Sequence, residues 1–296
     1  GGYKIKTASS PKNTKGRDLF SVIHAKSRVA NIDLVGFRLA GSAEDSVITE
    51  CTADGDLTGN KVTLCKFEHC HSVGRLIHGA ATGCIIRCCG SDSVLVGGTA
   101  TECTIQDCLV VMNLMYATDA ELPAFGGIAK SIGNGSIVER CFVSGTVKNT
   151  GQGPLRFSGI AALCNGSTIR NCAVGELQLI GRGVNLVERI AGSNSRAPTL
   201  INNATVYGGG NAVSGRGYSG ITVAPALFKQ RYFETNLLWD FDAVWQWDAK
   251  AGRPALRSNP SSLVATKAPN KSQPAKMVDL LQSQIRANIW LYYLGG

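Results

Sequence analysis

The chain has 296 residues, of which 44% are hydrophobic and 17% are charged, and its formal net charge is +9. The hydrophobic share excludes a disordered chain, because disordered segments lack the apolar surface that offsets the entropy lost on ordering. No apolar run reaches the roughly 18 residues that would cross a bilayer. Thirty-five glycines in a chain with few charges predict many short strands joined by many turns.

Residues 1–17 are expected to form a lead-in, either a truncated first coil or a cap. From residue 18 to residue 222 the sequence repeats: a hydrophobic residue is followed three positions later by a small one, usually cysteine. The steps between these small residues are short and slightly uneven up to Cys108, and they are clearly longer after it. The small residues are Val35, Cys51, Cys70, Cys88, Cys108, Cys141, Cys172 and Ala204.

Such short units cannot bury their apolar side alone, whereas coaxial stacking buries a continuous core. The sequence therefore predicts an all-β fold, a right-handed parallel β-helix over residues 18–222. Equivalent residues of neighbouring coils would lie about 4.8 Å apart. Cysteine is small and apolar, so the repeated cysteines are expected to form an internal ladder of reduced thiols. The predicted ladder residues are Cys51, Cys70, Cys88, Cys108, Cys141 and Cys172.

A zinc site is the alternative interpretation of the cysteines, because Cys65, His69, Cys70 and His71 cluster and further cysteines follow. The repeat explains the same spacings without a metal. Residues along a strand also alternate between two faces, which suits a tetrahedral site poorly. We therefore predict neither a metal nor a cofactor.

Residues 223–257 are rich in tryptophan and are expected to cap the solenoid by folding over its open end, since exposed strand edges need cover. The alternative is a carbohydrate platform, in which aromatic rings stack on sugars and carboxylates bind hydroxyl groups. Its binding residues would be Trp239, Trp245, Trp247, Asp240 and Asp242. A polar linker at 258–275 and a C-terminal helix at 276–296 are predicted to follow.

The segment Gly159-Ile160-Ala161 through Asn171-Cys172-Ala173-Val174-Gly175 resembles the GLUG-type repeat of bacterial surface proteins. The tryptophan segment is similar to the closing sequence of the same proteins, so the resemblance covers about residues 18–257. It departs most from the family pattern at residues 42–115. The resemblance implies a parallel β-helix on secreted or outer-membrane-anchored proteins of gut anaerobes. Those proteins include adhesins and the non-catalytic part of immunoglobulin A1-specific metallopeptidases.

Catalytic patterns are weak in this sequence. The metallopeptidase would need a His-Glu-x-x-His helix, and no such string occurs. Glycosidases need two neighbouring carboxylates, and the residues that precede the ladder supply none on adjacent coils. Those residues are Glu50, His69, Arg87, Asp107, Arg140 and Asn171. We therefore expect no enzymatic activity.

The basic residues are spread along the chain rather than gathered with aromatics, so no nucleic-acid partner is expected. The expected function is that of an adhesin-like stalk or binding surface for host glycans or extracellular proteins. As the resemblance implies, it would lie outside the cell or on an outer membrane, held only by an anchor that this chain lacks. The alternatives are a glycan-active β-helix lyase or hydrolase, and an accessory region of an immunoglobulin A1 protease-like protein.

Overall fold

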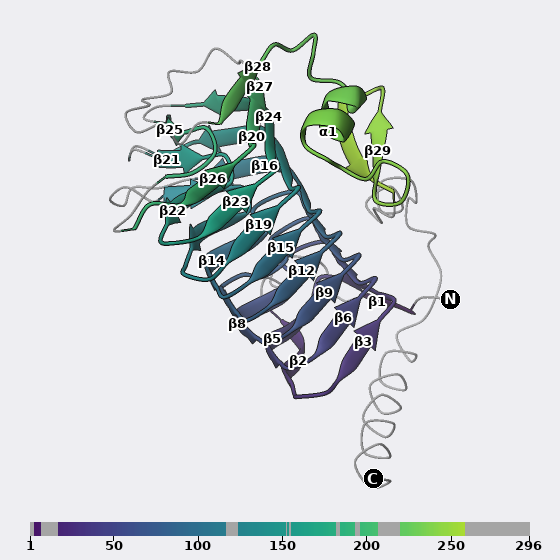
Figure 1. The fold of residues 1–296 in the computed structure, drawn as a ribbon. Coiled ribbons are helices and arrows are strands. Elements are labelled where there is room, and N and C mark those ends of the chain that lie inside the picture. The colour runs from purple at the N-terminus through teal and green to yellow at the C-terminus, as the bar shows by residue number, and fades with distance from the viewer. Residues whose placement is uncertain are drawn as a thin grey trace, which may run out of the picture.

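A computed structural model describes residues 3–6, 17–116, 124–151, 153, 155–181, 184–192, 196–206 and 220–257. In these residues the chain winds into a parallel β-helix, whose strands stack in three long parallel sheets (Figure 1). The predicted fold class is confirmed. The predicted linker and the predicted helix at 276–296 lie outside the described residues. None of the described helices has the length and apolar character needed to span a membrane.

Each coil adds one strand to each of the three sheets, here named A, B and C. Sheet A contains β1 (Tyr3–Lys6), β4 (Ile32–Val35), β7 (Thr52–Ala53), β10 (His71–Ser72), β13 (Gly90–Ser91), β16 (Leu109–Tyr116), β20 (Phe142–Asn149), β24 (Ala173–Ile180), β27 (Ala204–Val206) and β28 (Ile221–Val223). Sheet B contains β2 (Asp18–Ile23), β5 (Arg38–Glu44), β8 (Thr58–Thr63), β11 (Ala80–Thr82), β14 (Val96–Thr101), β18 (Ala129–Ile132) and β22 (Ala161–Cys164). Sheet C contains β3 (Arg28–Ala30), β6 (Val47–Thr49), β9 (Lys66–Glu68), β12 (Ile85–Arg87), β15 (Thr104–Gln106), β19 (Ile137–Glu139), β23 (Thr168–Arg170) and β26 (Thr199–Ile201).

The later coils carry one more strand, which lies between sheets A and B in chain order. These strands form sheet D, made of β17 (Ala124–Gly126), β21 (Leu155–Ser158) and β25 (Val184–Glu188). After sheet A ends, the chain forms helix α1 (Gln230–Asn236) and an antiparallel hairpin of β29 (Trp245–Asp248) and β30 (Arg253–Leu256).

The register of sheet C shows how regular the early coils are. The partners on its successive early strands are evenly spaced along the sequence, at Val29, Ile48, Phe67, Ile86 and Ile105. Beyond Ile105 the step becomes longer, and the partners are Val138, Ile169 and Leu200. The uneven spacings predicted for the early coils were therefore wrong, because the repeat length of the early coils is constant.

Every strand of sheet C is followed by a residue with positive φ, and every strand except β26 is also preceded by one, so the chain turns sharply at two corners. The corner that precedes sheet A has φ between 49° and 58° in every described coil. Its residues, here called the corner row, are Asn31, Glu50, His69, Cys88, Asp107, Arg140, Asn171 and Asn202. Only glycine, asparagine and aspartate adopt this left-handed conformation routinely. The other four residues of the corner row therefore hold a backbone conformation that is unfavourable for them.

The interior ladder follows directly after the corner row, and it corrects the prediction at three coils. Ile32, Cys89 and Asn203 take the positions predicted for Val35, Cys88 and Ala204. Because Phe67 pairs with Ile86 rather than Ile85, Cys89 takes the interior position, and Cys88 takes the corner in place of Arg87. The ladder residues are Cys51, Cys70, Cys89, Cys108, Cys141 and Cys172, followed by Asn203. Each of these thiols donates to the carbonyl two residues earlier, at 3.2–3.4 Å. All eleven cysteines of the chain are buried and unbridged.

The tryptophan-rich segment packs along the flank of the solenoid and not over its end. Its buried residues cover the first residues of the sheet A strands, which are apolar and face outward. From the segment these are Phe228, Phe233, Leu237, Trp239, Phe241, Trp245 and Leu256, and from sheet A they are Leu109, Phe142, Ala173 and Ala204. Figure 1 shows α1 and β29 beside the strands of sheet A. The prediction of a cover over the open end was therefore wrong in its placement.

Candidate binding groove

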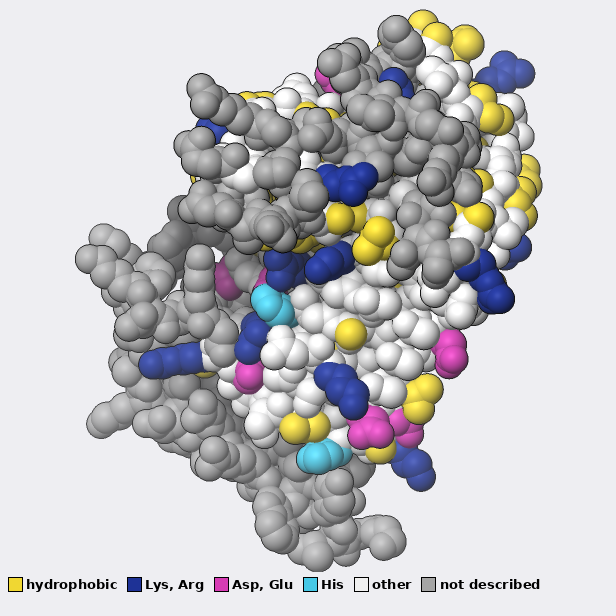
Figure 2. All heavy atoms as spheres, turned by 90° about the vertical axis from the view of Figure 1, so that its left-hand side faces the viewer, with side chains coloured by type: hydrophobic (Ala, Val, Ile, Leu, Met, Phe, Trp, Pro, Cys, Tyr) yellow, Lys and Arg dark blue, Asp and Glu magenta, His cyan; other side chains and the backbone are white. Residues whose placement is uncertain are grey.

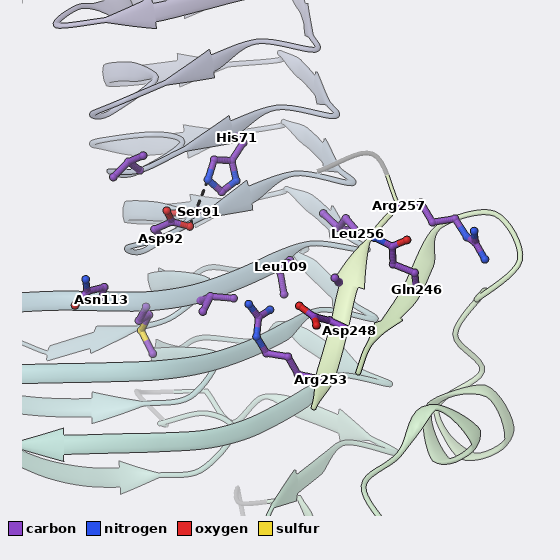
Figure 3. A pocket seen from close by; sticks show the side chains of 14 residues that line it. His71, Ser91, Asp92, Leu109, Asn113, Gln246, Asp248, Arg253, Leu256 and Arg257 are labelled. Carbon is purple, nitrogen blue, oxygen red and sulfur yellow. Dashed lines mark ion pairs between the residues drawn. The ribbon is translucent and has the colours of Figure 1, made fainter. Parts of the chain in front are cut away.

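A cavity of about 570 Å³ lies between the outer face of sheet A and the β29–β30 hairpin. Its polar lining comes from both sides (Figure 3). His71 and Asp92 come from the solenoid, and Asp248 and Arg253 come from the hairpin. Asn113 belongs to the same lining and lies on the side away from the hairpin (Figure 3).

His71 is the most unusual residue of this lining. Its side chain is only 3% exposed, and neither ring nitrogen makes a hydrogen bond within the described part of the chain. Nε2 lies 3.3 Å from Asp92 Oδ1, and the Asp92 side chain is 40% exposed and so remains solvated. A buried polar group without a hydrogen bond costs about 1–3 kcal/mol and calls for an explanation, such as a bound water or ligand.

A second cavity of about 350 Å³ continues the first, because both are lined by Val111 and Arg253. We call the two together the groove. Its floor includes Asn113, Thr146 and Gln178, which are partners on β16, β20 and β24. Thr146 Oγ1 donates to Gln178 Oε1 at 3.4 Å. A row of uncharged hydrogen-bonding side chains therefore runs across the strands.

The corner row holds the hairpin against the solenoid. Arg140 donates two hydrogen bonds to the buried carboxylate of Asp107, from Nε at 2.8 Å and from Nη2 at 3.2 Å. Trp245 Nε1 donates to the same carboxylate at 3.4 Å, and Trp239 Nε1 donates to the Asn171 carbonyl at 2.7 Å. These indole contacts fix the wall of the groove that the hairpin supplies.

The predicted carbohydrate platform is not built from its tryptophans. Trp239 and Trp245 are buried and stack on each other with ring centroids 4.3 Å apart, so neither presents a face to a sugar. Trp247 is partly buried, and its ring centroid lies 6.0 Å from that of Phe233. Burial against the flank of the solenoid therefore contradicts the binding role predicted for Trp239 and Trp245.

The two predicted acidic residues lie in the turn before the hairpin. Asp240 Oδ1 accepts hydrogen bonds from the backbone N–H groups of Asp242 and Ala243, and the side chain of Asp242 is exposed. Neither residue lines the groove. The residues that do are Gln246 and Asp248, which alternate with the tryptophans along β29. In the sequence, this alternation of tryptophan with polar residues was the signal that Gln246 and Asp248 face away from the tryptophans.

The acids weighed for catalysis form a chain of ion pairs on the corner and on sheet C. Arg140 Nη1 contacts Glu139 at 2.6 Å, and Arg170 Nη2 contacts the same carboxylate at 3.0 Å. Burial lowers the pKa of Arg140, but the hydrogen bonds and charge of Asp107 outweigh it and raise that pKa overall. The described residues contain no group of three or more His, Cys, Asp or Glu side chains arranged to hold a metal ion.

On the face shown in Figure 2, the basic side chains of the described residues are interspersed with acidic, histidine and hydrophobic ones.

Comparisons with protein-family models, with curated proteins and with solved structures found no match.

Proposed function

We propose that this chain is a non-catalytic, adhesin-like binding protein that holds an extended glycan in the groove between sheet A and the β29–β30 hairpin. The observation that carries the proposal is His71, which is buried at the groove without a hydrogen bond from the described residues. A surface location, outside the cell or on an outer membrane, belongs to the same proposal. It rests on the resemblance of the repeats to GLUG-type proteins.

The chemistry of the groove supports a sugar more than an apolar ligand. Amide side chains both donate and accept hydrogen bonds, and hydroxyl groups do the same, so the row of Asn113, Thr146 and Gln178 can match sugar hydroxyl groups of either role. Asp92 and Asp248 add acceptors on the two opposing walls. The row crosses three neighbouring strands, which favours a chain lying along the solenoid axis.

A glycan-active enzyme is the second candidate function, and one observation favours it. Asp92 and Asp248 line the same cavity from opposite walls. Glycosidases place two carboxylates on either side of the bond that they cleave. An accessory region of an immunoglobulin A1 protease-like protein would use the groove for binding alone.

The test is binding of the whole chain to an array of glycans and extracellular matrix proteins, with product analysis of each bound glycan. We expect saturable binding and intact glycans. Asn113→Ala and Gln178→Ala should each weaken binding about tenfold, which corresponds to about 1.4 kcal/mol. Gln106→Ala, on sheet C away from the groove, is the matched amide control and should leave binding unchanged. Shortened or unsaturated products would establish the enzyme instead.

His71→Phe separates a functional histidine from a structural one. Phenylalanine keeps a ring of similar size and removes two nitrogens that make no hydrogen bond, and the 3.3 Å contact that it also removes is with a solvated carboxylate, so stability should rise by about 1–3 kcal/mol. Glycan affinity should fall in the same variant. A variant that is destabilised and still binds the glycan normally would contradict the proposal. Chemical denaturation and calorimetric titration measure the two quantities separately.

A further inference from the structure

Arg253 presents a guanidinium group to the groove without an ion-pair partner among the described residues. It is the first residue of β30 and lines both cavities, at the point where they join. Its side chain donates one long hydrogen bond, from Nη1 to the carbonyl of Pro254 at 3.4 Å. A planar guanidinium has five donors, so most of its capacity is unused.

The other arginine of the lining is already engaged. Arg257 Nε donates to the carbonyl of Phe241 at 3.1 Å, and Nη2 donates to the same oxygen. Figure 3 shows its side chain directed away from His71 and Asp92. Arg253 is therefore the guanidinium that the hairpin presents to the groove.

The surroundings of Arg253 are partly desolvated and differ between the two cavities. Burial lowers the pKa of Arg253, while the charges of Asp248 and Asp92 oppose that effect. Both acids line the first cavity, whereas the charged groups lining the second are Glu176, Lys229 and Arg253. The second cavity thus carries an excess of positive charge. Asp248 and Asp92 act on Arg253 only through their charges and form no ion pair with it, and a half-buried cation without a contacting carboxylate is costly, so an anion is favoured there.

We propose that Arg253 binds the carboxylate of an acidic sugar, so that the ligand class is a uronate-containing oligosaccharide. The guanidinium fork matches a carboxylate with two parallel hydrogen bonds. Lys229, which is exposed at the same cavity, adds a second positive charge. Asn113, Thr146 and Gln178 remain available for the hydroxyl groups of the same chain. This inference rests on the proposed function, since it names the ligand of the same groove.

The experiment compares each acidic oligosaccharide with its uncharged counterpart. Galacturonate and hyaluronan oligomers are titrated into the whole chain by calorimetry, beside the same oligomers with methyl-esterified carboxyl groups. We expect at least one acidic oligomer to bind tenfold or more tightly than its ester. This preference should shrink as the salt concentration rises, because exposed charges are then screened.

Three variants test the role of Arg253. Arg253→Gln should remove the preference for the acid and leave binding of the ester within a factor of about two to three. Arg253→Lys keeps the charge without the fork and should retain only part of the preference. Lys250→Gln, at an exposed lysine in the turn of the same hairpin, makes the same charge change at a residue that does not line the groove and should leave the preference for the acid in place. Thermal unfolding verifies that each variant is folded.

The outcomes separate this inference from the function on which it rests. Equal binding of acid and ester overturns the role of Arg253 and leaves groove binding intact. The same holds if Lys250→Gln loses as much as Arg253→Gln, or if neutral glycans of the array bind while every acidic oligomer fails. If no glycan binds the wild-type chain at all, the proposed function itself is overturned.

Discussion

The early and late coils of this β-helix have the same interior and very different outer faces. The early coils, from Val29 to Ile105, are short and equal, whereas each later coil, from Ile105 to Leu200, is more than half as long again. The ladder that starts at Cys51 continues to Cys172 through both regions. The corner row also keeps its φ values throughout. The additional length therefore enters the part of each coil that runs from sheet A to sheet B.

The inserted residues widen the face that carries the groove. The sheet A strands β7, β10 and β13 are two residues long, whereas β16, β20 and β24 have eight each. His71 and Asp92 come from short coils, and Thr146 and Gln178 come from long ones, so the groove crosses the boundary between the two regions. Additional residues are tolerated better between the sheets than inside the core, because the core is closely packed.

The largest effect is expected from a deletion in the shared core. Phe67 is fully buried in an early coil, and Phe157 is fully buried in sheet D of a late coil. Both belong to one continuous cluster of buried residues. Phe67→Ala and Phe157→Ala should each lower the free energy of unfolding by about 3–5 kcal/mol. Urea unfolding followed by circular dichroism should give one transition for both. A separate transition at lower urea concentration in Phe157→Ala would show that the late coils unfold independently of the early coils.

The second prediction concerns the corner that holds the hairpin. Arg140→Met leaves the Asp107 carboxylate buried without its partner, which should cost about 3–5 kcal/mol. Arg170→Met breaks the half-exposed ion pair between Arg170 and Glu139 of the preceding coil, and it should cost about 0–1 kcal/mol. Because Trp245 contacts Asp107, tryptophan fluorescence during denaturation reports on both variants. Equal losses in the two variants would mean that Asp107 does not anchor the hairpin.

Much of the fold could be predicted from the sequence, because the coil repeat leaves isoleucine and cysteine at regular positions. The register failed at three coils, and the clearest case is the coil in which Ile85 is followed by Ile86 and Cys88 is followed by Cys89. Each doublet fits two registers equally well. The backbone decides between them, because the corner row gives only a partial compositional clue: four of its eight residues are asparagine or aspartate, and Cys88 is not among them.

The groove could not be predicted in the same way. It joins residues from His71 to Arg257 that come together only when the hairpin docks on the flank. The alternation along β29 shows that Trp245 and Gln246 point to opposite sides, but it does not show which surface the tryptophans cover. That surface is defined by Leu109 and Phe142, which face outward from sheet A. The missing hydrogen bonds of His71 have no sequence signature at all.

A third prediction uses the buried thiols to compare the regions at alkaline pH. Burial raises the pKa of Cys164, in a late coil, to about 12, and that of Cys88, at an early corner, to about 11. A raised pKa in the folded state contributes stability that is complete below the unfolded value of about 9 and is lost as pH rises toward the folded value. Each thiol should therefore cost about 1.4 kcal/mol per pH unit above pH 9.

Denaturant titrations in a reductant from pH 8 to pH 11 measure this slope. Cys164→Ala and Cys88→Ala should each flatten it by one thiol, and Cys164→Ala should still do so between pH 10.5 and 11. The comparison matters more than the absolute stability, because each alanine also leaves a small cavity. A slope that neither variant changes would mean that these thiols ionise alike in the folded and unfolded chain.

The smallest expected effect concerns the corner that precedes sheet C, where the two regions use different residues. In the early coils this corner has φ between 42° and 66°, at Lys26, Asp45, Leu64, Gly83 and Glu102. Glycine occupies it in the late coils, at Gly135 and Gly166. A Cβ at Gly83 would approach only Leu64 side-chain atoms, the nearest at 2.7 Å, and Leu64 is largely exposed and can move. The backbone cost then decides the result.

Alanine in this conformation costs about 1–2 kcal/mol, and the lower entropy of the unfolded chain offsets about 0.4–1 kcal/mol of it. Gly83→Ala should therefore destabilise the chain by at most about 1.6 kcal/mol, measured by urea unfolding. The reverse test is Leu64→Asn, which should stabilise the early coils by a few tenths of a kcal/mol, because asparagine tolerates this conformation better than leucine. If Gly83→Ala is instead stabilising, the corner holds its φ without strain. The glycines of the late coils would then need another explanation than backbone conformation.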